Sequence, residues 1–379
     1  MLGSWVRAPS GSQDGAPEWC PVLSFEVLDM RGRELIFCAI FFLVGNCLGG
    51  WLPSVPWAYL LVAAALSFCA VRHRDAAVLL PCFLLLGISG LQMAACSPDT
   101  GVSAISAMAA DAKDSFSLYL DRFAPPGDER AILKALTIGD RSGISRDLRR
   151  IYRDAGAMHL LALSGLHVGI IYGIASLALS FLGGGRAARV IRTAVILTFL
   201  WTYAVVSGLS PSISRAVVMI TVYEISGFIS AGKNGLTSLA ASALLTTLFS
   251  PESPHNVGFQ LSYSAVLAIH TIHPRLKGLL DTRSVLLRKV WDTLSIAISC
   301  QATCGVIGWL YFGTFPQYFL LTNLMAVPVA TVAMHLIAAS LLTSAIPGLG
   351  ELCAAGLRSA LWLLNKVLEI ISGLDGIFF

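Results

Sequence analysis

Apolar runs of close to 20 residues alternate along this chain with short polar stretches. An α-helix needs about 20 apolar residues to cross the hydrocarbon core of a bilayer, so each run predicts a membrane helix. Helices pair their backbone groups within their own segment, as a bilayer requires. The pattern predicts helices at residues 34–50, 56–72, 76–94, 158–182, 189–207, 212–230, 290–312, 318–345 and 352–372.

Two further apolar segments, residues 236–250 and 258–272, are shorter and are bounded by proline and glycine. Their length suits half-helices or re-entrant segments, and broken helices of this kind usually line cavities. The predicted fold is therefore an all-α polytopic membrane protein with about eleven membrane segments, two of them short and half-helical or re-entrant.

Composition supports the membrane setting, because 56% of the residues are hydrophobic, 13% are charged and the mean hydropathy is +0.74. The net charge of +4 is too small to indicate nucleic-acid binding by itself. The cysteines include no CxxC pair, and no nearby His or third Cys completes a site with Cys300 and Cys304. We therefore expect no disulfide scaffold, no metal site and no cofactor.

Charge and hydropathy divide the chain into four regions. Residues 1–33 are polar and predict a disordered N-terminal tail without a cleavable signal. Residues 34–95 predict the N-terminal membrane helices, and residues 158–372 predict a second, larger transmembrane domain. The basic loops place the cytoplasm on one side, so residues 96–157 are expected to form an extracytoplasmic segment.

The 96–157 segment contains one clear amphipathic helix, from about Ser145 to Ala155. Leu148 and Tyr152 recur at helical spacing on one face, and the opposite face is basic. This basic face is either a solvated surface at the membrane interface or a collar that attracts phosphate at a pore mouth. Its residues are Arg146, Arg149, Arg150 and Arg153.

Residues 156–169 place two histidines, a serine and three glycines at the start of a membrane helix. Unpaired polar groups are costly in hydrocarbon, so this cluster indicates a path or site inside the membrane. Other neutral polar groups either hold helices together or line a hydrated passage. The candidates are Ser164, His167, Gln260, Ser262 and Asn323, whereas His270 and His335 are interpreted as helix-packing residues.

Arg215 and Glu224 lie on one predicted helix, about 13 Å apart along its axis, which is too far for a direct ion pair. Arg215 is either an interface anchor or a group that faces an interior path. Glu224 is either hydrogen-bonded to a neighbouring helix or faces the pore.

The run Ala162-Leu163-Ser164-Gly165-Leu166-His167-Val168-Gly169, preceded by Asp154 to His159, resembles the signature of the ComEC family of competence proteins. Residues 208–216, residues 258–263, and Asn323-Leu324 with Pro328 resemble later motifs of that family. The resemblance covers roughly residues 130–335. It implies a multi-pass inner-membrane channel that passes single-stranded DNA into the cytoplasm during natural transformation, with the polar and charged residues named above along the path and at its mouth.

The chain also departs from that family. Residues 96–130 are too short for the OB-like domain that members often carry, and the ligands of a metallo-β-lactamase-like nuclease domain do not occur, so no enzymatic activity is expected. Residues 227–234 nearly spell a phosphate-binding loop but lack its Ser or Thr. The implied partners are single-stranded DNA, membrane lipid, an envelope DNA receptor and a cytosolic ATPase or helicase, and the chain could form homo-oligomers.

Two alternatives remain open from the sequence. A secondary transporter of a small solute uses the same broken helices and mid-membrane polar residues. An intramembrane serine protease would use Ser164-Gly165 with a histidine base, but Ala162 stands where that pattern has glycine.

Overall fold

The computed structural model describes residues 32–73, 79–96, 103–124, 127–228, 234–313, 315 and 317–374. All regular structure within these residues is helical, which confirms the predicted all-α fold class. The tail predicted for residues 1–33 lies outside the described residues as far as residue 31.

The first group of helices ends with α8, which begins within the polar motif of residues 156–169. It comprises α1 (Gly32–Leu48), α2 (Pro56–His73), α3 (Leu79–Cys96), α4 (Ser103–Leu120), α5 (Asp128–Ile138), α6 (Arg146–Asp154), α7 (Met158–Leu161) and α8 (Gly165–Ala178).

The second group completes the chain and includes short 3-10 and π segments, labelled η. It comprises η3 (Ser180–Leu182), α9 (Arg186–Val206), α10 (Pro211–Ser226), α11 (Gly235–Phe249), η4 (Ser253–His255), α12 (Val257–Thr271), α13 (His273–Lys277), α14 (Val285–Cys300), η5 (Gln301–Gly305), α15 (Val306–Phe312), α16 (Phe319–Thr343) and α17 (Leu349–Ser372).

Among the residues that the structure describes, three helical stretches are long and apolar enough to cross a membrane: α9, the continuous run Val285–Phe312, and α16. They support an α-helical membrane protein, but they do not confirm eleven membrane segments. Helices α11 and α12 occupy the two short apolar segments and contain 15 residues each. The prediction that these two helices are half-helices or re-entrant segments of the membrane domain stays a prediction.

Two predicted continuous helices are interrupted. The 158–182 segment ends its first turn at Leu161 and begins α8 only at Gly165. The 290–312 segment contains the π-turn η5, which lies against α12: the Cys304 thiol donates to the Leu261 carbonyl at 3.4 Å, and the Thr303 hydroxyl donates to the Ser264 carbonyl at 3.4 Å. Polar side chains that bond to a neighbouring helix allow such local departures from α-helical hydrogen bonding.

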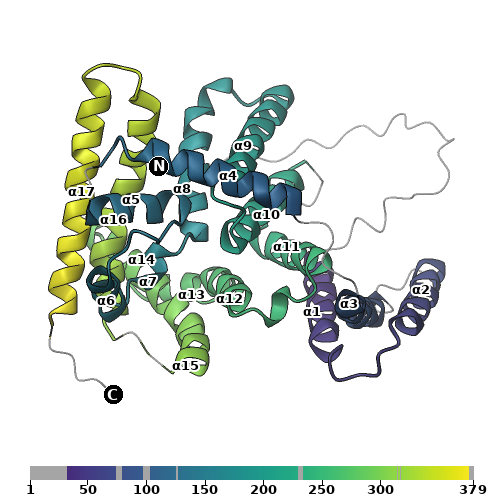
Figure 1. Cartoon of the computed structure of the whole chain (residues 1–379). Helices are drawn as coiled ribbons and strands as arrows, with labels where there is room; N and C mark the ends of the chain where they lie inside the picture. Colours follow the sequence, from purple (N-terminus) through teal and green to yellow (C-terminus); the bar gives the residue numbers. More distant parts are fainter. Residues whose placement is uncertain are drawn as a thin grey trace, which may run out of the picture.

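Helices α1 to α3 lie at the opposite edge of the molecule from α17, and α1 contacts α11 and η4 (Figure 1). The contact between α1 and α3 is very close, because a Cβ on Gly45 would lie 1.9 Å from the Leu84 carbonyl oxygen. Gly87 stands in the same relation to the Phe42 carbonyl oxygen, at 2.1 Å. Glycines permit this close approach of two helix backbones.

The largest hydrophobic core joins α4 to α7 with α16 and α17. Within α5, Ile132, Leu133 and Leu136 are fully buried against these long helices. The amphipathic helix predicted near residues 145–155 is confirmed as α6, which begins after Ser145, whose hydroxyl accepts the Leu148 amide at 3.1 Å. Burial of apolar side chains therefore holds α5 and α6 against the long helices.

Residues 119–155 contact α16 near both of its ends. The Tyr119 hydroxyl lies 3.1 Å from the Ser344 hydroxyl just after the end of α16, and Thr322 near its start donates to the Ala155 carbonyl at 2.5 Å. Thr322 and Ser344 are about 33 Å apart along the helix axis. The placement of residues 96–157 outside the membrane stays a prediction, but Tyr119 and Ala155 of this segment lie at the two ends of a candidate membrane span.

Five helices pack in a closed ring. Helix α8 packs on α10, α10 on α12, α12 on α14, α14 on α16, and α16 again on α8. Helix α9 packs on α8 and α10, whereas α17 packs on α16 and lies at the edge of the molecule (Figure 1). The ring therefore has an inner layer of five helices partly covered by outer helices.

Candidate functional site

The break before α8 brings Ser164 and His167 together. The backbone N–H of Ser164 donates to Nδ1 of His167 at 3.3 Å, and the Ser164 hydroxyl lies 3.0 Å from the same nitrogen. His167 is buried, with 3% of its surface exposed. A side chain that accepts a backbone amide at a helix start forms half of a capping box, so this contact explains why the helix begins at Gly165.

His159 lies beside this cap, on α7. Its Nδ1 donates to the Gly156 carbonyl at 3.1 Å, and its ring centre is 5.4 Å from that of Phe319 at the start of α16. The Asn323 side chain lies within hydrogen-bonding reach of His159 and also donates to the Phe319 carbonyl at 2.7 Å. Four polar residues of two predicted motifs, His159, Ser164, His167 and Asn323, are thus gathered where α7, α8 and α16 begin.

His159 and His167 differ in their exposure. The His159 side chain is exposed, whereas that of His167 is buried. Sequence analysis placed His159 only in the motif. The residues next to a histidine in the sequence do not show whether its side chain is buried or exposed. Only the packing of the folded protein decides this.

Arg215 is buried, with 7% of its surface exposed, and it connects two helices of the ring. Its Nη2 donates to the Gly258 carbonyl at 2.9 Å, in the first turn of α12. The Gly258 amide in turn donates to the Oδ1 of Asn256 at 2.8 Å. The Nε of Arg215 is buried and makes no hydrogen bond within the part of the chain that the structure describes. Arg215 therefore lies in a helix contact rather than on an open surface.

Glu224 lies where α8, α9 and α10 meet and is 5% exposed. The Tyr172 hydroxyl donates to its Oε1 at 2.5 Å, and the Thr193 hydroxyl donates to its Oε2 at 3.0 Å. One carboxyl group thus links three helices, which corresponds to the interhelical interpretation of this residue.

The remaining polar candidates lie on α12 and are half-buried. The Gln260 side chain donates to the Pro254 carbonyl at 3.0 Å, and this bond holds η4 against the start of α12. Ser262 follows on the same helix. The structure therefore does not gather all the predicted residues in one place: Ser164, His167 and Asn323 are close together, whereas Arg215, Glu224, Gln260 and Ser262 are distributed around the ring. Their role in a DNA path stays a prediction.

Helix α6 has an exposed basic face. Tyr152 and Leu148 are buried beneath it, and the Tyr152 hydroxyl donates to the Asn365 Oδ1 of α17 at 2.9 Å. Burial raises the pKa of the Tyr152 hydroxyl above its ordinary value, so it remains a donor at all physiological pH values. Arg150 and Arg153 each lie 3.4 Å from Asp154. All four arginines are exposed: Arg146, Arg149, Arg150 and Arg153.

One side of α8 is exposed and rich in glycine. Val168 and Tyr172 pack toward α9 and α10, and Ile170 packs toward the core of α5 and α16. The opposite side of the helix is exposed and consists of Gly165, Leu166, Gly169 and Gly173. A Cβ on Gly169 or Gly173 would have no neighbour within 4 Å, so these glycines do not serve close packing against another helix.

Helix α16 has a corresponding exposed face. Its alanines and Ile337 pack toward α5 and α17, and the other side exposes Leu321, Met325, Pro328, Val332 and His335. The Nδ1 of His335 donates to the Thr331 carbonyl of its own helix at 2.8 Å. The interpretation of His335 as a packed histidine is therefore wrong. These residues are spaced alternately by four and three positions, which places them on one face of a helix. The sequence therefore contained a signal that His335 shares a face with them.

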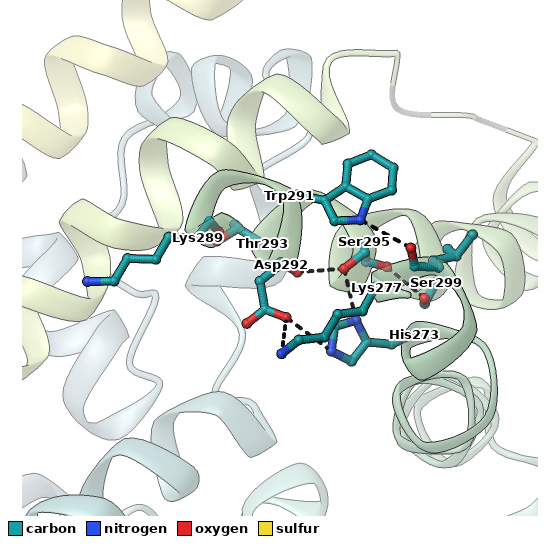
Figure 2. Close-up of polar contacts among 9 residues, drawn as sticks. His273, Lys277, Lys289, Trp291, Asp292, Thr293, Ser295 and Ser299 are labelled. Carbon is teal, nitrogen blue, oxygen red and sulfur yellow. Dashed lines mark hydrogen bonds and ion pairs between the residues drawn. The ribbon is translucent and has the colours of Figure 1, made fainter. Parts of the chain in front are cut away.

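A polar cluster that sequence analysis missed joins α13 to α14. Figure 2 shows Lys277 and His273 pointing toward the carboxylate of Asp292, at 2.7 and 3.4 Å. The other ring nitrogen of His273 lies 3.0 Å from the Ser295 hydroxyl, and the Trp291 indole N–H donates to the Leu276 carbonyl at 3.1 Å. These contacts fix the turn between the two helices.

Comparison with known proteins gives the chain its family. The family described as competence protein matches residues 136–379, well over half of the chain and the whole of the ring. The chain belongs to the competence protein family. Membership confirms the resemblance found in the motifs near Ser164, Arg215, Gln260 and Asn323, all of which lie inside the matched residues.

A curated relative of this competence family member is ComE operon protein 3 of Bacillus subtilis (strain 168), 33% identical over 144 residues. The match covers 38% of this chain and 18% of the relative, so this chain corresponds to less than a fifth of that protein. No solved structure matches the chain. Helices α1 to α5 lie largely before the matched residues.

Proposed function

We propose that this chain forms the membrane passage through which single-stranded DNA reaches the cytoplasm during competence. The observation that supports the proposal is the closed ring of α8, α10, α12, α14 and α16. Two of these helices expose one face on the side away from their outer-layer neighbours. Family membership supports the link to competence.

The exposed faces of α8 and α16 suit a polymer of variable sequence. They present glycine, proline and apolar side chains, and His335 is the titratable residue on the α16 face. Walls without fixed charge do not hold phosphates strongly, and conduction requires that each contact be weak enough to release. Contacts of this kind also do not distinguish one base from another.

The basic face of α6 suits the entrance. Four exposed arginines on one short helix attract a phosphate backbone and release its counterions. Residue 155, where α6 ends, contacts α16 near its start, so this face lies at the end of the ring where α8 and α16 begin. Arg215 and Glu224 are assigned to holding the ring together, because both are buried in helix contacts.

Movement of DNA requires an energy source in addition to a passage. We propose that a cytosolic ATPase or helicase, or the membrane potential, supplies it, and that an envelope receptor delivers the strand. Assembly of several copies around one passage is compatible with this scheme. The inner membrane is the expected location.

The proposal predicts that removal of two entrance arginines weakens DNA binding. For Arg149→Ala with Arg150→Ala, we expect about tenfold weaker binding of a single-stranded oligonucleotide at low salt, and a slope of log affinity against log salt that is smaller by about 1.4. The measurement is fluorescence anisotropy with the full chain in nanodiscs, together with transformation frequency.

The matched control removes two exposed arginines before and within α14, Arg283→Ala with Arg288→Ala, which changes the net charge equally. Arg149→Lys with Arg150→Lys should retain most of the affinity. Equal weakening by both alanine pairs would contradict an entrance at α6. Normal transformation in a deletion strain, or uptake of a labelled solute in place of DNA, would favour the transporter alternative.

A further inference from the structure

His159 and Phe319 form a pair of adjacent aromatic rings beside the basic helix α6. Attraction of phosphate by the arginines of α6 does not by itself require such a pair. The two ring centres are 5.4 Å apart and the ring planes are inclined by 48°. Phe319 is half-buried at the start of α16, whereas His159 is exposed. One aromatic ring therefore supports a second ring that is accessible to solvent.

The imidazole of His159 is held in a defined orientation. Its Nδ1 donates to the Gly156 carbonyl, and the Asn323 side chain lies beside it. The Gly156 amide in turn donates to the Arg153 carbonyl at 2.9 Å. Two consecutive hydrogen bonds thus connect the ring to the last turn of α6, whose exposed arginines attract phosphate.

We propose that His159, supported by Phe319, is a stacking platform for one unpaired nucleobase of the entering strand. The inference rests on the proposed function and specifies the ligand at its mouth. Sites for single strands combine cationic groups that follow the phosphates with aromatic rings on which bases stack. Here the arginines of α6 supply the first part and the exposed imidazole supplies the second. Every base has a π-face, so such a platform accepts any sequence.

The test compares two probes of equal length and charge, a thymidine oligonucleotide and an abasic oligonucleotide with the same backbone. Both are titrated against the full chain in nanodiscs. The native protein should bind the thymidine probe about tenfold more tightly than the abasic probe, because stacking requires the base. His159→Ala should abolish this difference and leave the affinity for the abasic probe unchanged.

His159→Phe keeps a ring without the imidazole and should retain the preference for bases, so it also serves if the alanine variant fails to fold. Trp309→Ala removes an exposed aromatic side chain elsewhere and should leave the preference unchanged. Arg149→Ala with Arg150→Ala should weaken both probes equally.

The platform is overturned if His159→Ala retains the native preference, or if the native protein binds both probes equally. In the second case the protein binds a phosphate backbone alone, and the proposed function survives. If neither probe binds, the proposed function itself fails. These outcomes separate the two proposals.

Discussion

Glu224 shows how one residue determines the contact of three helices. Its carboxyl group accepts from Tyr172 of α8 and Thr193 of α9 while it belongs to α10. Removal of a shared acceptor from a buried site leaves donors without a partner, and each such group costs about 1–3 kcal/mol. The residue therefore contributes to the stability of the ring wall rather than to an open surface.

Two substitutions of Glu224 distinguish the contribution of its hydrogen bonds from the contribution of its charge. We expect Glu224→Leu to destabilise the protein by about 2 kcal/mol or more, because both hydroxyls lose their acceptor. Glu224→Gln keeps an oxygen acceptor and should retain most of the stability and of the DNA uptake. Thermal unfolding in detergent, with transformation frequency, measures both effects. A loss of uptake in Glu224→Gln at native stability would instead indicate a pore-facing carboxylate.

At the scale of elements, glycines decide how closely helices approach. The contact between α1 and α3 depends on Gly45, because the carbonyl of Leu84 occupies the place of its missing side chain. By contrast, Gly169 and Gly173 of α8 have open space beside them. The same residue type thus supports close packing in one helix and an exposed face in another.

The substitution Gly45→Ala should force α1 away from α3. The added methyl group would meet backbone that cannot rotate aside, and overpacking of this kind typically costs about 1–3 kcal/mol. Gly50→Ala is the control, since nothing lies within 4 Å of that position. Fluorescence-detected melting of the detergent-solubilised protein should show a lower midpoint for Gly45→Ala alone. Equal midpoints would mean that the two helices separate without cost.

For the whole molecule, the segment before α8 determines the topology. Its contacts with Ser344 and Thr322 lie at the two ends of α16, and the separation of about 33 Å resembles the thickness of the hydrocarbon core. If α16 crosses the bilayer, residues near Tyr119 and residues near Ala155 lie close to opposite membrane surfaces. If the entire 96–157 segment were outside the membrane, residues near Tyr119 and residues near Ala155 would instead lie on the same side of the bilayer.

Labelling of single cysteines distinguishes these arrangements. Arg122 lies beside the Tyr119 ring, and Arg153 lies two residues before Ala155. Both arginines are exposed, so a cysteine at either position is accessible to the label. Arg122→Cys and Arg153→Cys also change the net charge equally. In a background without other cysteines, an impermeant maleimide should label Arg153→Cys from outside intact cells and Arg122→Cys only in inverted vesicles. Labelling of both from outside would support the extracytoplasmic placement.

The sequence alone determined the properties that depend on neighbours along the chain. Apolar runs predicted an all-helical membrane protein, and the spacing of Leu148 and Tyr152 beside arginines predicted α6, because helix formation and amphipathicity are local. The motif around Ser164 correctly indicated the competence family. The cap that divides the 158–182 segment was hidden by the apolar residues around it.

Only the tertiary structure decided which polar groups meet and which faces are exposed. Tyr119 and Ser344 are 225 positions apart, and no local pattern relates them. Arg215 and His335 both interrupt apolar helices, yet one is buried against the Gly258 carbonyl and the other is exposed. The physical reason is that burial depends on the packing of distant helices, whereas hydropathy records only the residue itself.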